Sequence, residues 1–229
     1  MKAIIISILF FTVACNSLPK EGFTNKAEAK NKMVNGLKEG KWVEYLDSAL
    51  RITTESSPSF YALTVYDKGN PLGIVGVYTI NSQLVSETPY VNGKINGVQK
   101  MYFESGQLWI ENPCKDNKKD GIKKQYYESG KLCKATPYTE DMKNGVAKIY
   151  YESGGLMSEM PFVNGETDGV AKEYFENGSL KDERTFNNGV INGKVIFYYE
   201  NGKIFHEATY INGKSENVKY YDSTGHEIK

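Results

Sequence analysis

The most reactive side chains in this sequence are few, and their positions do not suggest a catalytic set. The chain has 229 residues, with two histidines (His206 and His226) and three cysteines (Cys15, Cys114 and Cys133). His206 lies at a strand position that other copies of a repeat fill with Ser86, Ile110, Lys134, Ser158 and Asp182. No His-x-His or Cys-x-x-Cys pair has metal-ligand spacing, and no plausible base accompanies the serines. We therefore expect no enzyme, no metal ion and no cofactor.

Carboxylates and glycine-rich segments do not change this expectation. The stretch from Asp116 to Asp120 lacks the alternating oxygens and distal glutamate of a calcium loop, and no Gly-Lys-Ser/Thr opens a helix around phosphate. An enzyme that cleaves envelope polymers would need two carboxylates about 5–10 Å apart in one cleft. The turn glutamates form instead a row between equivalent copies: Glu104, Glu128, Glu152, Glu176 and Glu200. Turn chemistry and solubility explain these residues better than catalysis does.

A strict 24-residue period organises the chain. Glycines recur at this spacing, and a tyrosine follows each of them by five residues. The repeat positions are Gly97, Gly121, Gly145, Gly169 and Gly193, with Tyr102, Tyr126, Tyr150, Tyr174 and Tyr198. Gly73 and Tyr78 continue the pattern upstream. A fixed period of this length predicts a repeat architecture.

Each repeat is too short for two helices and matches a β-hairpin with a connection. A turn such as Glu104-Ser105-Gly106 allows two registers: a two-residue turn, or a three-residue loop that ends on a left-handed glycine. We favour the second, because it places Val98, Tyr102, Leu108, Ile110 and Cys114 on one face. Recurring prolines, such as Pro113, are expected where strand pairing stops. The fold class is therefore all-β: an elongated antiparallel β-meander or solenoid of about seven hairpins.

The outer copies are irregular. The array is expected over residues 33–229, with an insertion at about residues 51–60 in the first repeat and a degenerate last repeat at residues 212–229. Imperfect polar end copies suit a solenoid, because its terminal units face water. Cys114 and Cys133 should lie two strands apart and at opposite strand ends. That separation exceeds the roughly 7 Å Cα limit of a disulfide, so we predict no bond.

The N-terminus resembles an export signal. Lys2 is followed by an apolar run from Ala3 to Phe11 and by small residues before Cys15. A cysteine at this place is similar to the lipid-attachment site of bacterial lipoproteins, although Thr12 departs from the leucine usual there. The alternative is an ordinary signal peptide that happens to contain Cys15. We predict a signal peptide at residues 1–14, cleaved before Cys15, and a lipid-attached polar tether at residues 15–32.

Charge gives no case for nucleic acid. The chain has 28 Lys plus Arg and 28 Asp plus Glu, so nucleic acid is not expected as a partner. Lysines also form a row at Lys100, Lys124, Lys148 and Lys172. Rows of mixed charge keep an extended sheet soluble, and rows of Tyr and Lys could alternatively bind a protein or a polymer. We expect a monomer or weak association.

Segments such as Asn92 to Gly97, leading to Tyr102-Phe103-Glu104-Ser105-Gly106, resemble the variant form of the MORN (membrane occupation and recognition nexus) repeat. The resemblance covers about residues 33–229. It implies an elongated hairpin array that contacts proteins or lipids without catalysis, and some bacterial members carry an antitoxin label.

Two functions follow as expectations. The first is a non-catalytic, membrane-anchored repeat lipoprotein that acts as a protein-interaction scaffold in the bacterial cell envelope, facing the outer membrane or periplasm. The second is an antitoxin or immunity-type protein that binds and neutralises a toxin, for which export to the envelope is a poor location.

Overall fold

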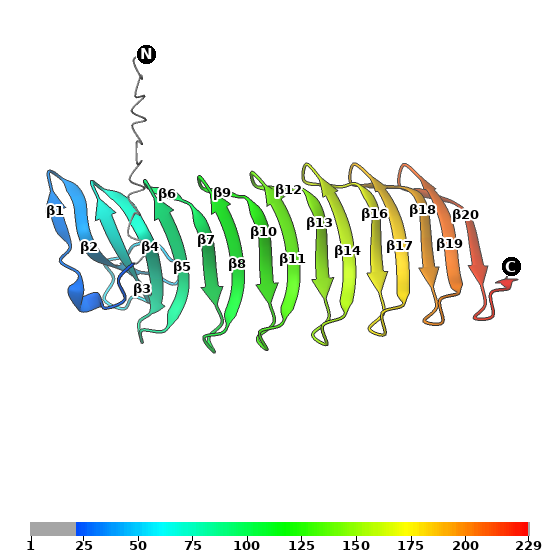
Figure 1. The fold of residues 1–229 in the computed structure, drawn as a ribbon, viewed down its shortest axis with the longest axis horizontal. Coiled ribbons are helices and arrows are strands. Elements are labelled where there is room, and N and C mark those ends of the chain that lie inside the picture. The colour runs from blue at the N-terminus through cyan, green and yellow to red at the C-terminus, as the bar shows by residue number, and fades with distance from the viewer. Residues whose placement is uncertain (1–21, 229) are drawn as a thin grey trace, which may run out of the picture.

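The chain folds into one long antiparallel sheet of hairpins laid side by side (Figure 1). This computed structural model describes residues 22–228. In that part of the chain 21 strands form a single sheet, and its pairings join strands that are close in sequence. Colour therefore runs in order from one end of the row to the other, and the two ends do not meet. The predicted all-β meander is confirmed.

The array begins with long strands and a short 3-10 helix, η1 (Lys26–Glu28). The first strands are β1 (Lys32–Val34), β2 (Leu37–Leu46), β3 (Phe60–Asp67), β4 (Asn70–Thr79) and β5 (Leu84–Val91). The segment between β2 and β3, residues 47–59, is longer than the other hairpin loops.

Five regular hairpins follow. Their first strands are β7 (Gly97–Tyr102), β10 (Gly121–Tyr126), β13 (Gly145–Tyr150), β16 (Gly169–Tyr174) and β18 (Val190–Tyr198). Their second strands are β8 (Leu108–Lys115), β11 (Leu132–Thr139), β14 (Leu156–Val163), β17 (Leu180–Asn187) and β19 (Ile204–Ile211). Two-residue strands lie in the connections: β6 (Lys94–Ile95), β9 (Lys118–Lys119), β12 (Met142–Lys143) and β15 (Glu166–Thr167). The sheet ends with β20 (Lys214–Tyr221) and β21 (Glu227–Ile228).

The hairpin loops have the predicted three-residue form. The Phe103 N–H donates to the Gln107 carbonyl at 2.8 Å, and the Gly106 N–H donates to the Phe103 carbonyl at 2.9 Å. Gly106 has φ +84°, in the left-handed region that glycine occupies without a steric penalty. The prediction of a left-handed glycine at the end of the loop is confirmed at Gly106, Gly130, Gly154, Gly178 and Gly202, whereas Ser82 takes this place in the loop between β4 and β5.

The predicted single apolar face is wrong, because each second strand carries a bulge. Tyr102 pairs with Leu108, but Met101 pairs with Ile110, so Trp109 is an extra residue. The same shift recurs in the later hairpins. A one-residue slip moves every following side chain to the other face. Ile110 and Cys114 therefore share a face with Met101, opposite to the face of Tyr102 and Val98.

The prolines do not end the strands, which corrects a second expectation. β8 continues past Pro113 to Lys115 and pairs there with β9. The Pro113 carbonyl accepts from the Asp120 N–H at 3.0 Å. A Cβ built on Gly121 would lie 3.0 Å from the Cβ of Pro113, and Gly121 has φ +119°. Proline packing and backbone conformation together explain why glycine recurs at this position.

The N-terminal described segment packs on the start of the sheet. Phe23 is buried with Tyr61 and Leu63, and Glu28 forms an ion pair with Lys41. The polar tether predicted for residues 15–32 is therefore not free over its described part, because Phe23, Glu28 and Ala29 contact the array. Cys15 and the predicted signal peptide lie outside the described residues.

Candidate functional site

The sheet presents two faces with different chemistry. We call one the tyrosine face, which carries the positions equivalent to Val98, Lys100, Tyr102, Glu111 and Pro113. We call the other the hollow face, which carries the positions equivalent to Gln99, Met101, Ile110, Asn112 and Cys114. The assignment follows from the register on either side of the bulge.

A ladder of tyrosine–glutamate hydrogen bonds runs along the tyrosine face. In five places a tyrosine hydroxyl donates to the glutamate carboxylate of the preceding hairpin, 14 or 15 residues earlier in the chain. The rungs are Tyr102–Glu87 at 2.6 Å, Tyr126–Glu111 at 2.8 Å, Tyr174–Glu159 at 3.3 Å, Tyr198–Glu183 at 3.0 Å and Tyr221–Glu207 at 2.6 Å. We call this set the Tyr–Glu ladder. Each rung joins two neighbouring hairpins.

The environment of the ladder shifts its tyrosines toward the neutral form. Burial and the nearby Glu111 carboxylate raise the pKa of Tyr126 to about 12. Burial and Glu183 likewise raise the pKa of Tyr198 to about 12. A neutral phenol donates to the carboxylate, whereas a phenolate would face it as a like charge. The ladder therefore has a structural role that requires protonated tyrosine.

The repeat positions predicted from sequence all belong to this structural framework. The tyrosines from Tyr102 to Tyr198 lie on the tyrosine face, and the glycines from Gly97 to Gly193 lie where the first strand of a hairpin starts or bends. These glycines have φ between 110° and 121°. They position the sheet and do not converge on one place.

The hollow face varies from copy to copy. The position of Ile110 is filled in successive hairpins by Ser86, Ile110, Lys134, Ser158, Asp182 and His206. The position of Gln99 is filled by Val75, Gln99, Lys123, Ala147, Ala171 and Val195. Each part of this face therefore presents its own combination of charge and shape.

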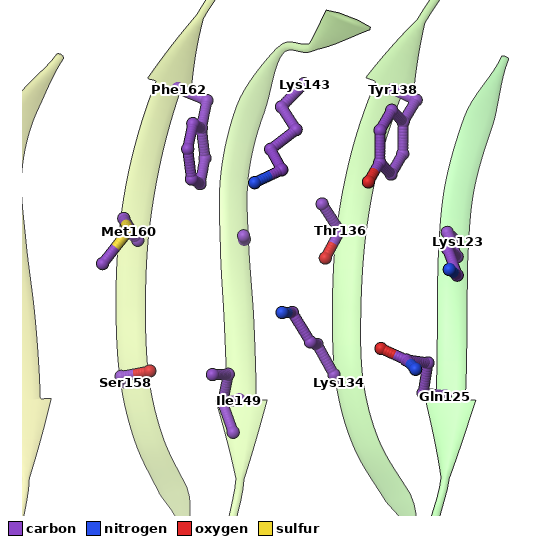
Figure 2. A pocket seen from close by; sticks show the side chains of 11 residues that line it. Lys123, Gln125, Lys134, Thr136, Tyr138, Lys143, Ile149, Ser158, Met160 and Phe162 are labelled. Atoms are coloured by element: carbon purple, nitrogen blue, oxygen red, sulfur yellow. The ribbon is translucent and has the colours of Figure 1, made fainter. Parts of the chain in front are cut away.

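A hollow of about 330 Å³ lies on this face across β10 to β14 (Figure 2). We call it the lysine hollow. Lys123 and Lys134 line it from β10 and β11, and Ile149, Met160 and Phe162 line it from β13 and β14. Lys143, from β12, lies between Tyr138 and Phe162. The remaining lining residues are Gln125, Thr136, Tyr138, Ala147 and Ser158. Ala147 is buried between these larger side chains, and its small size helps to leave the space open.

Two neighbouring lysines repel the Lys123 ammonium of the hollow. Burial lowers the pKa of the Lys123 ammonium, and the nearby charges of Lys119 and Lys134 lower it further. Within residues 22–228, no ion pair joins Lys119, Lys123, Lys134 or Lys143 to a carboxylate. The Lys143 ammonium lies 4.5 Å from the centre of the Phe162 ring, and that of Lys119 lies 5.1 Å from the Tyr138 ring. An anion would relieve this repulsion.

The charge changes sign one hairpin further on. Asp182 is 1% exposed and lies 3.0 Å from the Arg184 guanidinium. Burial raises the pKa of the Asp182 carboxyl, and Arg184 opposes that change. Arg184 also lies 3.6 Å from Glu173, so these groups already have partners.

The histidines and cysteines lie apart from the hollow. His206 stacks on Phe197 and Tyr220, with ring centres 5.5 and 4.8 Å away. His226 lies in the last turn, beside Thr224 and Asp222. Cys114 and Cys133 are free thiols in the structure, and the absence of a disulfide in the protein itself stays a prediction.

Residues 22–228 hold no group of three or more His, Cys, Asp or Glu side chains arranged to bind a metal ion. Over the same residues, no helix is long and apolar enough to span a membrane.

The lysine hollow is not predicted by the repeat pattern of the sequence. Its lysines come from different positions of two successive repeats, so no single column of the period contains them. A usable signal was present: lysine replaces an uncharged residue at Lys123, Lys134 and Lys143, compared with Gln99, Ile110 and Ile95 one or two repeats earlier.

Comparison with known families agrees with this geometry. The MORN repeat variant matches the chain in five copies, at residues 95–116, 119–140, 143–164, 167–188 and 191–212. Residues 95–212 are therefore a row of MORN repeat variants, and the likeness predicted for residues 33–94 and 213–229 stays a prediction. Comparison with curated proteins finds no match. The fold and the repeats together define a MORN repeat protein built for binding.

Proposed function

We propose that this protein is a non-catalytic scaffold that binds a protein partner through its hollow face, while a lipid on Cys15 holds it at the membrane of a bacterial cell envelope. The supporting observation is the contrast between the faces. The tyrosine face repeats the same hydrogen-bonded residues, whereas the positions of Gln99 and Ile110 on the hollow face vary in charge and size among the hairpins. Repeated residues serve the neighbour contacts of a solenoid. Varied residues on an extended surface give a partner something to recognise.

The path of the N-terminal segment fits this arrangement. Phe23 packs against Tyr61 and Leu63, and Tyr61 stacks on Tyr78 of the tyrosine face at 5.3 Å. The described chain therefore begins on the tyrosine face. An anchor attached before it would leave the hollow face free for a partner.

The anchor is tested by changing Cys15 to Ser and separating membrane from soluble fractions. We expect Cys15→Ser to remove the protein from the membrane fraction and to block its normal maturation, because several acyl chains at about 0.8 kcal/mol per methylene hold a lipoprotein on the bilayer. The matched control is Cys133→Ser, which removes a thiol elsewhere in the chain. If Cys15→Ser stays on the membrane and matures normally, the anchor is wrong.

An experiment in the same cells distinguishes the scaffold from the antitoxin or immunity function. Crosslinking in intact cells, followed by mass spectrometry, should identify an envelope protein as the partner. A stable one-to-one complex with the product of a neighbouring gene would favour the antitoxin or immunity function instead.

A further inference from the structure

We infer that the lysine hollow is a specific binding site for an acidic, apolar segment of a partner protein, in which a carboxylate side chain adjoins a large apolar one. The inference rests on the proposed function, because it names the chemistry that one part of the scaffold recognises. It concerns the hollow alone and does not depend on the lipid anchor.

The charge of the hollow selects an anion. Three lysines from three strands, β10, β11 and β12, line it: Lys123 and Lys134 lie on neighbouring strands, and Lys143 lies beside Phe162. Lys119, from β9, adds a fourth charge close enough to lower the pKa of Lys123. Like charges held together without carboxylate partners raise the free energy of the empty site, and an incoming carboxylate removes that cost. The chain as a whole has no net charge, so this is a local feature.

Apolar side chains next to these lysines select an apolar group. Ile149, Met160 and Phe162 come from β13 and β14, and Figure 2 shows their side chains on the same face as the lysines. Methionine and aromatic side chains give adaptable apolar contacts. A free inorganic anion would contact only the lysines, whereas a peptide with neighbouring acidic and apolar side chains would contact both the lysines and the apolar side chains.

The size and composition of the site also favour a peptide. The volume of about 330 Å³ is at the lower end of the range for ligand pockets and suits a few side chains. The cations are lysines, and no arginine fork lines the hollow to bind phosphate in a bidentate way. Point charges beside an apolar wall fit a carboxylate on a hydrophobic segment.

The test uses purified full-length protein and a fluorescein-labelled peptide of alternating glutamate and leucine, with fluorescence anisotropy as the readout. The hollow variant is Lys134→Gln with Lys143→Gln. The matched control is Lys100→Gln with Lys172→Gln, which removes the same charge from the tyrosine face. We expect the hollow variant to weaken binding by about fivefold or more, the control to change it by less than about twofold, and salt to weaken binding. Circular dichroism should show the same sheet content for all three proteins.

Two further measurements test the contributions of the lysines and of the apolar side chains separately. A peptide of alternating glutamate and serine keeps the charge and should bind more weakly than the glutamate–leucine peptide, because the apolar wall loses its partner. Met160→Ser should weaken only the leucine-containing peptide. Equal loss in the hollow variant and the control would show unspecific charge attraction and would overturn the inference.

Two other anion sources are included as competitors. Inorganic phosphate and vesicles of anionic phospholipid should not displace the peptide at matched charge concentration. If either one binds more tightly than the peptide and depends on Lys134 and Lys143, the hollow serves another ligand and the inference is wrong. Release of the Cys15→Ser protein from the membrane leaves this measurement unchanged, so the two proposals fail separately.

Discussion

Single residues fix the geometry of each hairpin. In the loop after β13, Gly154 has φ +103°, whereas its neighbour Gly155 does not occupy the left-handed region. Nothing lies within 4 Å of a Cβ added to Gly154, and the nearest atom to one on Gly155 is at 3.7 Å. The two glycines therefore differ in backbone conformation and not in available space.

This pair gives a prediction about conformational strain. Gly154→Ala should lower the free energy of unfolding by roughly 1–2 kcal/mol, because an L-residue is strained in the left-handed region. Gly155→Ala should leave stability unchanged or raise it by about 0.4–1 kcal/mol through the unfolded chain. Urea unfolding followed by circular dichroism measures both. If both substitutions lower the free energy of unfolding equally, the positive φ of Gly154 does not explain why glycine stands there.

Neighbouring hairpins are joined by the Tyr–Glu ladder, which has one gap. Tyr150 occupies a ladder position, but Ala135 stands where the other hairpins place glutamate. Ala135 lies in register with Lys124 and Lys148, on the strands that flank it. A carboxylate there would meet a phenol and two ammonium groups.

The gap gives a prediction with an internal control. Tyr126→Phe should cost about 1 kcal/mol of unfolding free energy, because it removes a hydrogen bond to Glu111. Tyr150→Phe should cost close to nothing, since Ala135 cannot accept a hydrogen bond. Ala135→Glu should stabilise the protein by up to about 1 kcal/mol through the phenol and the cross-strand lysines. If Tyr126→Phe and Tyr150→Phe lower the free energy of unfolding by the same amount, the ladder does not contribute to stability.

At the scale of the molecule, the ladder makes the stability of the fold decrease at alkaline pH. The folded-state pKa of Tyr126, Tyr198 and Tyr221 is raised to about 12, compared with about 10 for an unfolded tyrosine. A raised pKa means that the folded state retains its protons longer, so this stabilisation is complete below pH 10. It is lost as pH rises from about 10 to 12.

We therefore expect the free energy of unfolding to fall between pH 10 and pH 12. Lysines also titrate there, so the comparison is with a Tyr126→Phe, Tyr198→Phe double variant. The variant should be less stable at pH 8 and should lose less stability as pH rises, because two of the titrating rungs are absent. Urea titrations at pH 8, 10 and 11 measure the difference. Parallel pH curves would contradict the role of these rungs.

The sequence alone determines the period, the hairpins and the loops of this protein. Each of these is local: a left-handed glycine such as Gly106 sets its own turn, and a spacing of 24 residues forces equivalent residues into rows. Alternation along a strand could not reveal the bulge at Trp109, because a period-two pattern does not show where one extra residue is inserted. That bulge decides which residues share a face.

Only the tertiary structure decided the tyrosine face and the hollow face. The Tyr–Glu ladder joins residues mostly 15 positions apart in the sequence, and the lysine hollow joins Lys123, Lys134 and Lys143 with apolar side chains of β13 and β14. Such contacts depend on which strands are neighbours and which way their side chains point after the bulge. The repeat can be recognised from composition and spacing, whereas the lysine hollow forms only when the strands pair.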